Sequence, residues 1–480
     1  MATAALPLII QGGMGIGVSD WRLARAVSRH GQLGVVSGTS LDAVLVRRLQ
    51  DGDEGGHMQR GMERFPVPGV AEEVLRRYHL PGGRPPNTPY KSIPLWKQTV
   101  SHERTQLAML ATFVEVHLDK EGHRGPVGIN LLTKVQLPNL AALYGALLAG
   151  VDYVLMGAGI PREIPEVLDL LSEHRPAALK LEVDGLPPGR SEQLVLDPRT
   201  HWDGPPPPLR RPPFLPIIAS NSLATVLARK ASGRVDGFVV EGPTAGGHNA
   251  PPRGEPRFNE RGEPIYGERD EVDLAKLREL GLPFWVAGGA GSPERLAQAL
   301  RDGAAGVQVG TLFAFCEESG VDPEYKAAVL RYAARGEVDV ATDPRASPTG
   351  YPFKVVHWPG EPSSDRPRTR RCDLGYLRTA YLRPDGRIGY RCSAEPVEDH
   401  VRKGGRPEDT EGRRCLCNAL LANIGLGQLR DDGREEPPLL TSGDDLRTIA
   451  TFLAGRTSYS AEDVLDYLLA GSSRPPNVPG

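Results

Sequence analysis

The sequence predicts an α/β fold: a (β/α)8 barrel with insertions, followed by a C-terminal extension of loops and helices. Three observations predict it. Short apolar runs alternate with amphipathic stretches from the N-terminus to about residue 315, which is typical of βα units and a parallel sheet. Eight such repeats fit within this length and close a barrel. After about residue 320 the alternation is replaced by an arginine-rich, loop-rich region, 342–415.

Nine apolar runs qualify as strands, one more than the barrel needs, so we expect one of them to be an accessory strand. The doubtful pair is Ala178–Val183 and Leu215–Ser220, because a proline-rich stretch separates them. The other candidates are Leu6–Gln11, Leu33–Ser37, Val127–Leu131, Tyr153–Met156, Gly237–Glu241, Phe284–Ala287 and Gly306–Val309. Helices are predicted at Asp20–Arg29, Asn139–Ala149, Ser222–Ala231 and Pro293–Arg301.

Two insertions interrupt the repeats. Residues 51–125 contain PGGRPPNTPY, whose prolines and glycines exclude a continuous helix or a central strand. Residues 249–269 form a long loop after a predicted strand, on the side of a barrel where ligands are contacted. We therefore divide the chain into a barrel, 1–320, with these insertions, and a cysteine-containing extension, 321–480. Helices are predicted in the extension at Pro323–Arg335, Asp444–Ala454 and Ala461–Ala470.

Composition excludes several classes of protein. A hydrophobic content of 39% supports a real core, and the 56 glycines and 45 prolines are not periodic, which excludes collagen and predicts tight turns. A net charge of -3 gives no reason to expect a nucleic acid or an acidic membrane as partner. Five cysteines do not make a disulfide scaffold, and neither a secretory signal nor a membrane-spanning run is evident. We expect a soluble, cytoplasmic protein with a small-molecule substrate.

The strongest local motif is FWVAGGAGSPERLAQALRDGAAGVQVGTLF, at residues 284–313. One strand ends at Gly288 and Gly289, and the next ends at Gly310 and Thr311, each beside the predicted start of a helix. Bare glycine turns expose backbone N–H groups at helix N-termini, which favours a phosphate, and the loops after the last two barrel strands are the usual phosphate site. The alternative is that these glycines only form tight turns.

Two further motifs follow predicted strands. In DGFVVEGPTAGGHNAPPRG, paired glycines allow close approach to a flat ligand, and His248 is placed as a general base or acid. The alternative is a histidine that only structures the loop. In PLIIQGGMGIGVSD, four glycines surround Met14 after the first strand. A Rossmann interpretation is rejected, because Ser37-Gly38-Thr39 stands where it would need an acid.

Together, these motifs resemble the nitronate monooxygenase family, formerly called 2-nitropropane dioxygenases, and the related flavin enoyl reductases, over about residues 5–315. The resemblance implies a TIM barrel that holds FMN non-covalently at its C-terminal face. It implies that Gly13 and Met14 lie against the isoalloxazine, that Asn130 bonds to the ring, and that Lys180 lies near the pyrimidine side. It places Ala245, Gly246 and Gly247 along the ribityl chain, and Gly288, Gly289, Gly310 and Thr311 on the phosphate. His248 matches the family's catalytic histidine.

The activity that the resemblance implies is FMN-dependent oxidation of alkyl nitronates or nitroalkanes with O2, with His248 able to remove the α-proton of a neutral nitroalkane. The sequence departs from the simpler members, which have Glu-Ala before Gly-Gly-His where this chain has Thr244-Ala245. The insertions and the extension are additional. A long insertion beside the strand that carries Lys180, together with Gly-Gly-His, is similar to the stand-alone enoyl reductases of polyunsaturated fatty acid and polyketide synthases. The alternative is therefore an NADPH-dependent enoyl-thioester reductase that acts on an acyl carrier protein. A non-catalytic flavin- or phosphate-binding barrel is the third candidate.

Four of the five cysteines lie in the extension: Cys372, Cys392, Cys415 and Cys417. Four thiolates could hold Zn2+ or an iron–sulfur cluster. Their spacing is not that of a standard pair of CxxC motifs, so buried or free thiols and redox disulfides stay open as alternatives. The extension is also a candidate homodimer surface, which the residues alone do not decide.

Overall fold

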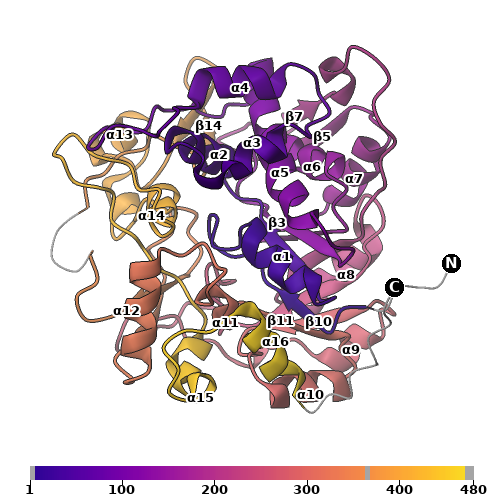
Figure 1. The fold of residues 1–480 in the computed structure, drawn as a ribbon, viewed down its shortest axis with the longest axis vertical. Helices are drawn as coiled ribbons and strands as arrows, with labels where there is room; N and C mark the ends of the chain where they lie inside the picture. The colour runs from indigo at the N-terminus through magenta and orange to yellow at the C-terminus, as the bar shows by residue number, and fades with distance from the viewer. Residues whose placement is uncertain (1–5, 363–367, 471–480) are drawn as a thin grey trace.

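The computed structural model describes residues 6–362 and 368–470 (Figure 1). Eight strands form one parallel sheet in the order β1-β11-β10-β9-β8-β4-β3-β2. The sheet closes because Gln11 N donates to Leu33 O at 2.9 Å and Leu33 N donates to Ile9 O at 3.1 Å. The predicted barrel is confirmed. Its strands are β1 (Ile9–Gln11), β2 (Gly34–Ser37), β3 (Val127–Leu132), β4 (Tyr153–Gly157), β8 (Phe214–Ile218), β9 (Phe238–Glu241), β10 (Phe284–Ala287) and β11 (Gly306–Val309).

Apolar side chains fill the barrel beneath its C-terminal end. Successive residues of a strand point to opposite faces, and the inward-facing cluster consists of Ile10, Leu33, Val35, Leu155, Leu215, Val239, Trp285 and Ala287. Their neighbours Ile9, Val36 and Val154 belong instead to the cluster that packs against the helices. The interior is therefore a packed core, and the C-terminal mouth is where a ligand can bind.

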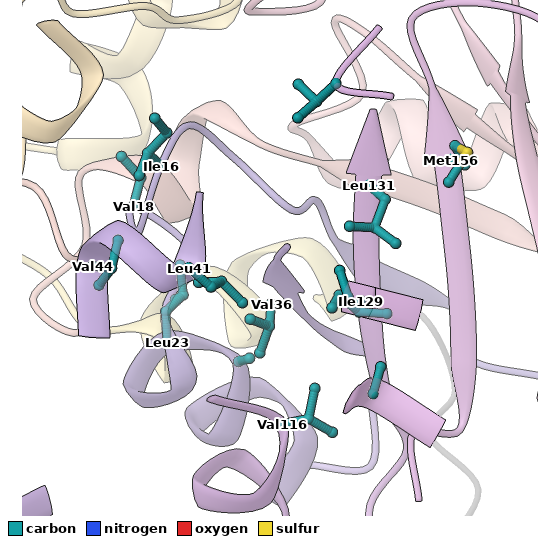
Figure 2. Packing of buried hydrophobic residues seen from close by; sticks show 14 of the residues in the cluster. Ile16, Val18, Leu23, Val36, Leu41, Val44, Val116, Ile129, Leu131 and Met156 are labelled. Carbon is teal, nitrogen blue, oxygen red and sulfur yellow. The ribbon is translucent and has the colours of Figure 1, made fainter. Parts of the chain in front are cut away.

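Helices surround the barrel, and side chains set where they begin. Asp20 accepts hydrogen bonds from Arg22 N and Leu23 N at the start of α1, and Ser292 accepts one from Arg295 N at the start of α10. Figure 2 shows Leu23, Val36 and Ile129 in one packed layer between barrel and helices. These helices are α1 (Trp21–Arg29), α2 (Leu41–Gln50), α5 (His102–Lys120), α6 (Asn139–Leu148), α7 (Ile164–Ser172), α8 (Asn221–Lys230), α9 (Leu274–Arg278), α10 (Pro293–Arg301) and α11 (Thr311–Ala314).

The accessory strand is the first of the doubtful pair. β5 (Ala177–Leu181) pairs antiparallel with β7 (Glu192–Leu196) in a separate two-stranded sheet. The second candidate, Leu215–Ser220, corresponds to barrel strand β8, which pairs with β4 and β9. Within the proline-rich stretch, β7 and a short 3-10 helix, η2 (Pro198–His201), are formed.

The segment 51–125 holds more regular structure than an inserted loop. It forms η1 (Glu54–Gly56), α3 (His57–Met62) and α4 (Val70–Tyr78), and it also includes α5, which packs against β2, β3 and α6. Helix α5 is therefore a barrel helix, and the insertion ends before it. The loop 249–269 leads into a short 3-10 helix, η3 (Glu268–Asp270), at its C-terminal end.

The C-terminal extension packs along one side of the barrel, and its last helix, α16 (Ala461–Leu469), then packs against α1, α10 and α11 (Figure 1). Its core is continuous with that of the barrel, since Val340, Leu446 and Val464 belong to the same cluster as Val36. Strand β6 (Val183–Asp184) pairs with β14, which ties the extension to the segment after β5. The described part of the region 342–415, expected to be loop-rich, contains β13, β14 and β15 and the end of β12. The elements are α12 (Pro323–Ala333), β12 (Asp339–Asp343), β13 (Phe353–His357), β14 (Thr379–Leu382), β15 (Ile388–Arg391), α13 (Val397–Arg402), η4 (Pro407–Thr410), α14 (Leu416–Ala422), η5 (Asp444–Thr448), α15 (Ile449–Leu453) and α16 (Ala461–Leu469).

The predicted capping box at the last helix is confirmed, because Ser460 and Asp463 bond reciprocally at the start of α16. Within the described ranges, no helix is both long enough and apolar enough to cross a membrane.

Candidate active site

A large cavity opens at the C-terminal mouth of the barrel. Its empty space is about 1620 Å³, which includes the open mouth. Each of the eight barrel strands contributes a lining residue at or near its C-terminal end, from Gly12 after β1 to Gln308 in β11. The extension completes the wall with Phe353, Tyr376, Cys417, Thr441, Ser442, Gly443 and Asp445, among others.

Gly13 lies against Asn130 at one wall of the cavity. Asn130 Nδ2 donates to Gly13 O at 3.1 Å, and a Cβ on Gly13 would lie 2.5 Å from Asn130 Cβ, so a side chain does not fit there. Asn130 Oδ1 is buried and accepts no hydrogen bond within the described part of the chain, and the same holds for Gln308 Oε1. Two buried acceptors without donors in one cavity are costly unless a ligand supplies the N–H or O–H groups.

Met14 also lines the cavity, but its backbone is already engaged. Its amide donates to Ser19 Oγ at 2.9 Å, and its carbonyl accepts from Ser19 N at 3.2 Å. A Cβ on Gly310 would lie 3.4 Å from Met14 Sδ, so the loop after β1 and the end of β11 meet here. Met14 is thus placed to contact a flat ligand by packing.

The end of β10 forms the predicted glycine turn. Gly288 and Gly289 have φ of 84° and 65°, in the left-handed region that other residues rarely adopt. A Cβ on Gly288 would lie 3.0 Å from Thr244 Oγ1. The turn lines the cavity just before the N-terminus of α10, where the helix dipole favours an anion.

The extension lies directly over this turn. Gly443 N donates to Thr311 Oγ1 at 3.1 Å, and Asp445 Oδ2 accepts from Gly291 N at 3.2 Å. Burial raises the pKa of Asp445 above its usual range. The predicted phosphate-binding residues Gly288, Gly289, Gly310 and Thr311 are therefore brought together, with a carboxyl group beside them.

His248 follows the predicted glycine pair and lines the same cavity. Gly247 has φ of 77°, and His248 Nε2 lies 2.7 Å from Ser347 Oγ. The imidazole packs edge-on against Phe353, with ring centroids 4.9 Å apart. Burial, together with the nearby Lys134, lowers the pKa of His248 to about 4, so the ring is neutral at neutral pH.

Comparison with known proteins relates part of this chain to a known family. The family model described as nitronate monooxygenase matches residues 213–343, a segment that runs from β8 to β12 and includes His248 and both glycine turns. This segment is therefore similar to the nitronate monooxygenase family. A nitronate monooxygenase of Paraburkholderia phytofirmans is 28% identical over 176 residues. That match covers 36% of this chain and 46% of the relative, so the chain spans about half the length of the curated relative.

Solved structures of similar proteins cover 97% of this chain. FabK from Thermotoga maritima is 16% identical, with 92% of that chain covered and a TM-score of 0.46. Nitroalkane oxidase from Streptomyces ansochromogenes is also 16% identical, with 95% covered and a TM-score of 0.44. The enoyl reductase domain of MlnA from Bacillus amyloliquefaciens is 11% identical, with 94% covered and a TM-score of 0.48.

Lys180 does not line the cavity, and its predicted place beside the flavin ring was wrong. It is exposed on β5, outside the barrel, and does not line the cavity. The apolar run around it has the pattern of a barrel strand, but it pairs with β7 instead. A lysine close to the site is Lys134, after β3, which affects the pKa of His248 and lies 5.1 Å from the centroid of the Tyr351 ring.

Several cavity residues were not predicted. Glu241 ends the strand before the Gly-Gly-His motif, and an acid closing an apolar strand was a usable signal. Tyr376 reaches the cavity from the extension, and its hydroxyl donates to Asp42 Oδ1 at 2.5 Å. Its position, like that of Cys417 and Asp445, depends on contacts between segments far apart in sequence, which no local pattern reveals.

The four cysteines of the extension lie near one another as two pairs. The Cys372 thiol is hydrogen-bonded to Cys392, and Cys415 to Cys417. The bond to Cys417 lowers the pKa of Cys415 to about 7, and Asn418 Nδ2 lies 3.4 Å from Cys415 Sγ. Among the described residues, no three or more His, Cys, Asp or Glu side chains are arranged to hold a metal ion. The proposed zinc or iron–sulfur site thus has no structural support here.

Proposed function

We propose that this chain is an FMN-dependent oxidoreductase of the nitronate monooxygenase type, which oxidises alkyl nitronates or nitroalkanes with O2. The observation that supports it most is the glycine-lined cavity at the barrel mouth, part of whose lining, including Gly246–His248 and Gly288–Gly289, lies within the segment that matches the family. A cavity at this end of a (β/α)8 barrel is the usual place for its chemistry.

The residues present fit an FMN group. Gly13 leaves a flat surface, and the unpaired acceptors Asn130 Oδ1 and Gln308 Oε1 suit N–H donors of an isoalloxazine ring. Ala245, Gly246 and Gly247 would border the ribityl chain. The turn at Gly288 and Gly289, together with Gly310 and Thr311, would hold the phosphate near the start of α10.

When bound, FMN supplies the electron-accepting chemistry that the amino-acid side chains lack. The chain's own residues bind, orient and exchange protons. His248 is neutral and fixed by Ser347 and Phe353, so it is suited to orient the oxygens of a nitro group. The extension completes the wall of the cavity, which limits the access of water to a bound ligand.

Anaerobic reduction of the purified protein tests this proposal. We expect a yellow protein that bleaches rapidly with an alkyl nitronate, does not bleach with NADPH alone, and consumes O2 on turnover. Rapid bleaching by NADPH, followed by reduction of an enoyl thioester on a carrier protein, would instead establish the reductase. A flavin-loaded protein that neither reagent bleaches would point to a non-catalytic barrel.

A further inference from the structure

Glu241 lies where two cavities meet. It ends β9 and lines the main cavity, and it also lines a smaller cavity bordered by the loop that follows His248. Among the described residues it is the only one that lines both. The polar lining of the smaller cavity includes exposed Arg253, half-buried Tyr266 and Asp270, and buried Asn249.

The Glu241 carboxyl group has no protein partner. In the described part of the chain, no hydrogen bond or ion pair to its side chain is formed, and burial alone raises its pKa to about 7. The buried carboxylate of Glu115, by contrast, forms an ion pair with Arg48 at 2.6 Å and accepts from Trp21 N at 3.0 Å. A partly buried carboxyl left without compensation in a ligand cavity is a mark of function.

His248 is less suited to remove a proton from carbon. Its Nε2 is already hydrogen-bonded to Ser347, and a base whose pKa is about 4 is weak at neutral pH. A base acts best when its pKa lies near the working pH, which is the case for Glu241.

We propose that Glu241 is the catalytic base that takes the α-proton from a neutral nitroalkane and passes it to solvent through the smaller cavity. The α C–H bond breaks and its electron pair forms the C=N bond of the nitronate, while the N=O π pair moves onto the nitro oxygen. The proton forms an O–H bond on the carboxylate of Glu241. Arg253, which is exposed, marks the outer end of the path. This inference rests on the proposed function, since it assigns a role within that reaction.

Two substrates separate proton removal from the later oxidation. Ethyl nitronate, prepared in base before mixing, has already lost the proton, whereas nitroethane has not. In holoprotein carrying Glu241→Gln, we expect kcat/KM for nitroethane to fall at least about 100-fold and that for ethyl nitronate to stay within about twofold. Glu260→Gln, which changes an exposed acid in the neighbouring loop, should leave both substrates unaffected.

Retention of FMN and an unchanged circular dichroism spectrum confirm that the variant is folded. Wild-type rates of nitroethane oxidation in Glu241→Gln overturn the inference, and so does an equal loss with both substrates. If that variant does not fold, Glu241→Asp replaces it. We then expect a larger deuterium isotope effect on the oxidation of α-deuterated nitroethane than in the wild type, and an unchanged isotope effect would contradict the inference. A wild-type protein inactive on both substrates overturns the proposed function itself.

The pH profile gives a second readout. Because a base must be deprotonated, kcat/KM for nitroethane should rise with pH and level off above about 7, and that for ethyl nitronate should lack this step. If kcat/KM for nitroethane and for ethyl nitronate rise in the same way near pH 7, the assignment of Glu241 as the base is contradicted. The other titratable groups that line the two cavities are His248, Asp445, Tyr376, Cys417, Arg253, Tyr266 and Asp270.

Discussion

A carboxyl group held in a cavity without a partner lowers the stability of the protein that keeps it. For Glu241 the folded-state pKa of about 7 lies above the ordinary value of 4.5. The folded state therefore holds its proton more tightly, and the stability associated with this group is fully present below pH 4.5 and lost as pH rises through 7. Residues that serve catalysis often weaken the fold in this way.

Glu241→Gln should therefore stabilise the protein at high pH. At pH 8 we expect its free energy of unfolding to exceed that of the wild type by about 2–3 kcal/mol, because the neutral amide avoids the buried charge. Below pH 4.5 the difference should vanish. Urea unfolding of both proteins at pH 8 and below pH 4.5 measures this difference. An equal gain in the free energy of unfolding under the two conditions would show that the charge of Glu241 is not the cause.

His248 titrates in the opposite sense. Its folded-state pKa of about 4 lies below the ordinary 6.5, so stability is lost as pH falls from 6.5 toward 4, because the unfolded chain then binds the proton more readily. His248→Ala should lower kcat/KM for nitroethane and ethyl nitronate alike, by about 10- to 100-fold, since its role is to orient the substrate. Steady-state kinetics on both substrates measures this, and unchanged turnover would remove His248 from the mechanism.

At the scale of elements, the turn after β10 depends on glycine. Gly288→Ala should weaken FMN binding at least about tenfold, because the left-handed φ of 84° and the contact with Thr244 force the turn to shift. Gly281→Ala is the matched control: its φ is 69°, but nothing lies within 4 Å of the added Cβ. It should cost about 1 kcal/mol of stability and leave the Kd for FMN unchanged. Equal Kd values for the two variants would show that the turn does not hold the cofactor.

The extension segment that covers this turn places Asp445 beside the phosphate position. Asp445→Asn should tighten FMN binding about three- to tenfold at pH 8, because a like charge is removed, and should have little effect at a pH where Asp445 is protonated. Riboflavin, which lacks the phosphate, should bind to the wild type and to Asp445→Asn with equal affinity. Fluorescence titration with the two ligands measures this, and an equal gain for riboflavin would contradict the electrostatic explanation.

Local signals predicted the barrel well. Pro293–Arg301 was predicted with its observed bounds, because Ser292 caps it and proline fits its first turn. The glycine turns and His248 followed from residue types directly after strands. Lys180 failed because β5 has the local pattern of a barrel strand, and only its partner strand distinguishes it. Tyr376, Cys417 and Asp445 reach the cavity through contacts between segments far apart in the sequence, which no local pattern predicts.

At the scale of the whole molecule, barrel and extension share one core. Val36 of β2 and Val464 of α16 belong to the same hydrophobic cluster, and Ser347 fixes His248. The division at residue 320 is thus not a break in packing. We expect calorimetry of the full chain to show a single unfolding transition that FMN shifts upward. Two separate transitions, with FMN shifting only one, would mean that the parts fold independently.

Equilibrium titration of the flavin-free protein with FMN and with riboflavin tests the site most directly. We expect one FMN to bind per chain, with riboflavin binding at least about tenfold more weakly, because the glycine turns at residues 288–289 and 310–311 would lose their anion. Absence of FMN binding, or equal affinity for the two ligands, would contradict a flavin cofactor held by its phosphate at the mouth of this barrel.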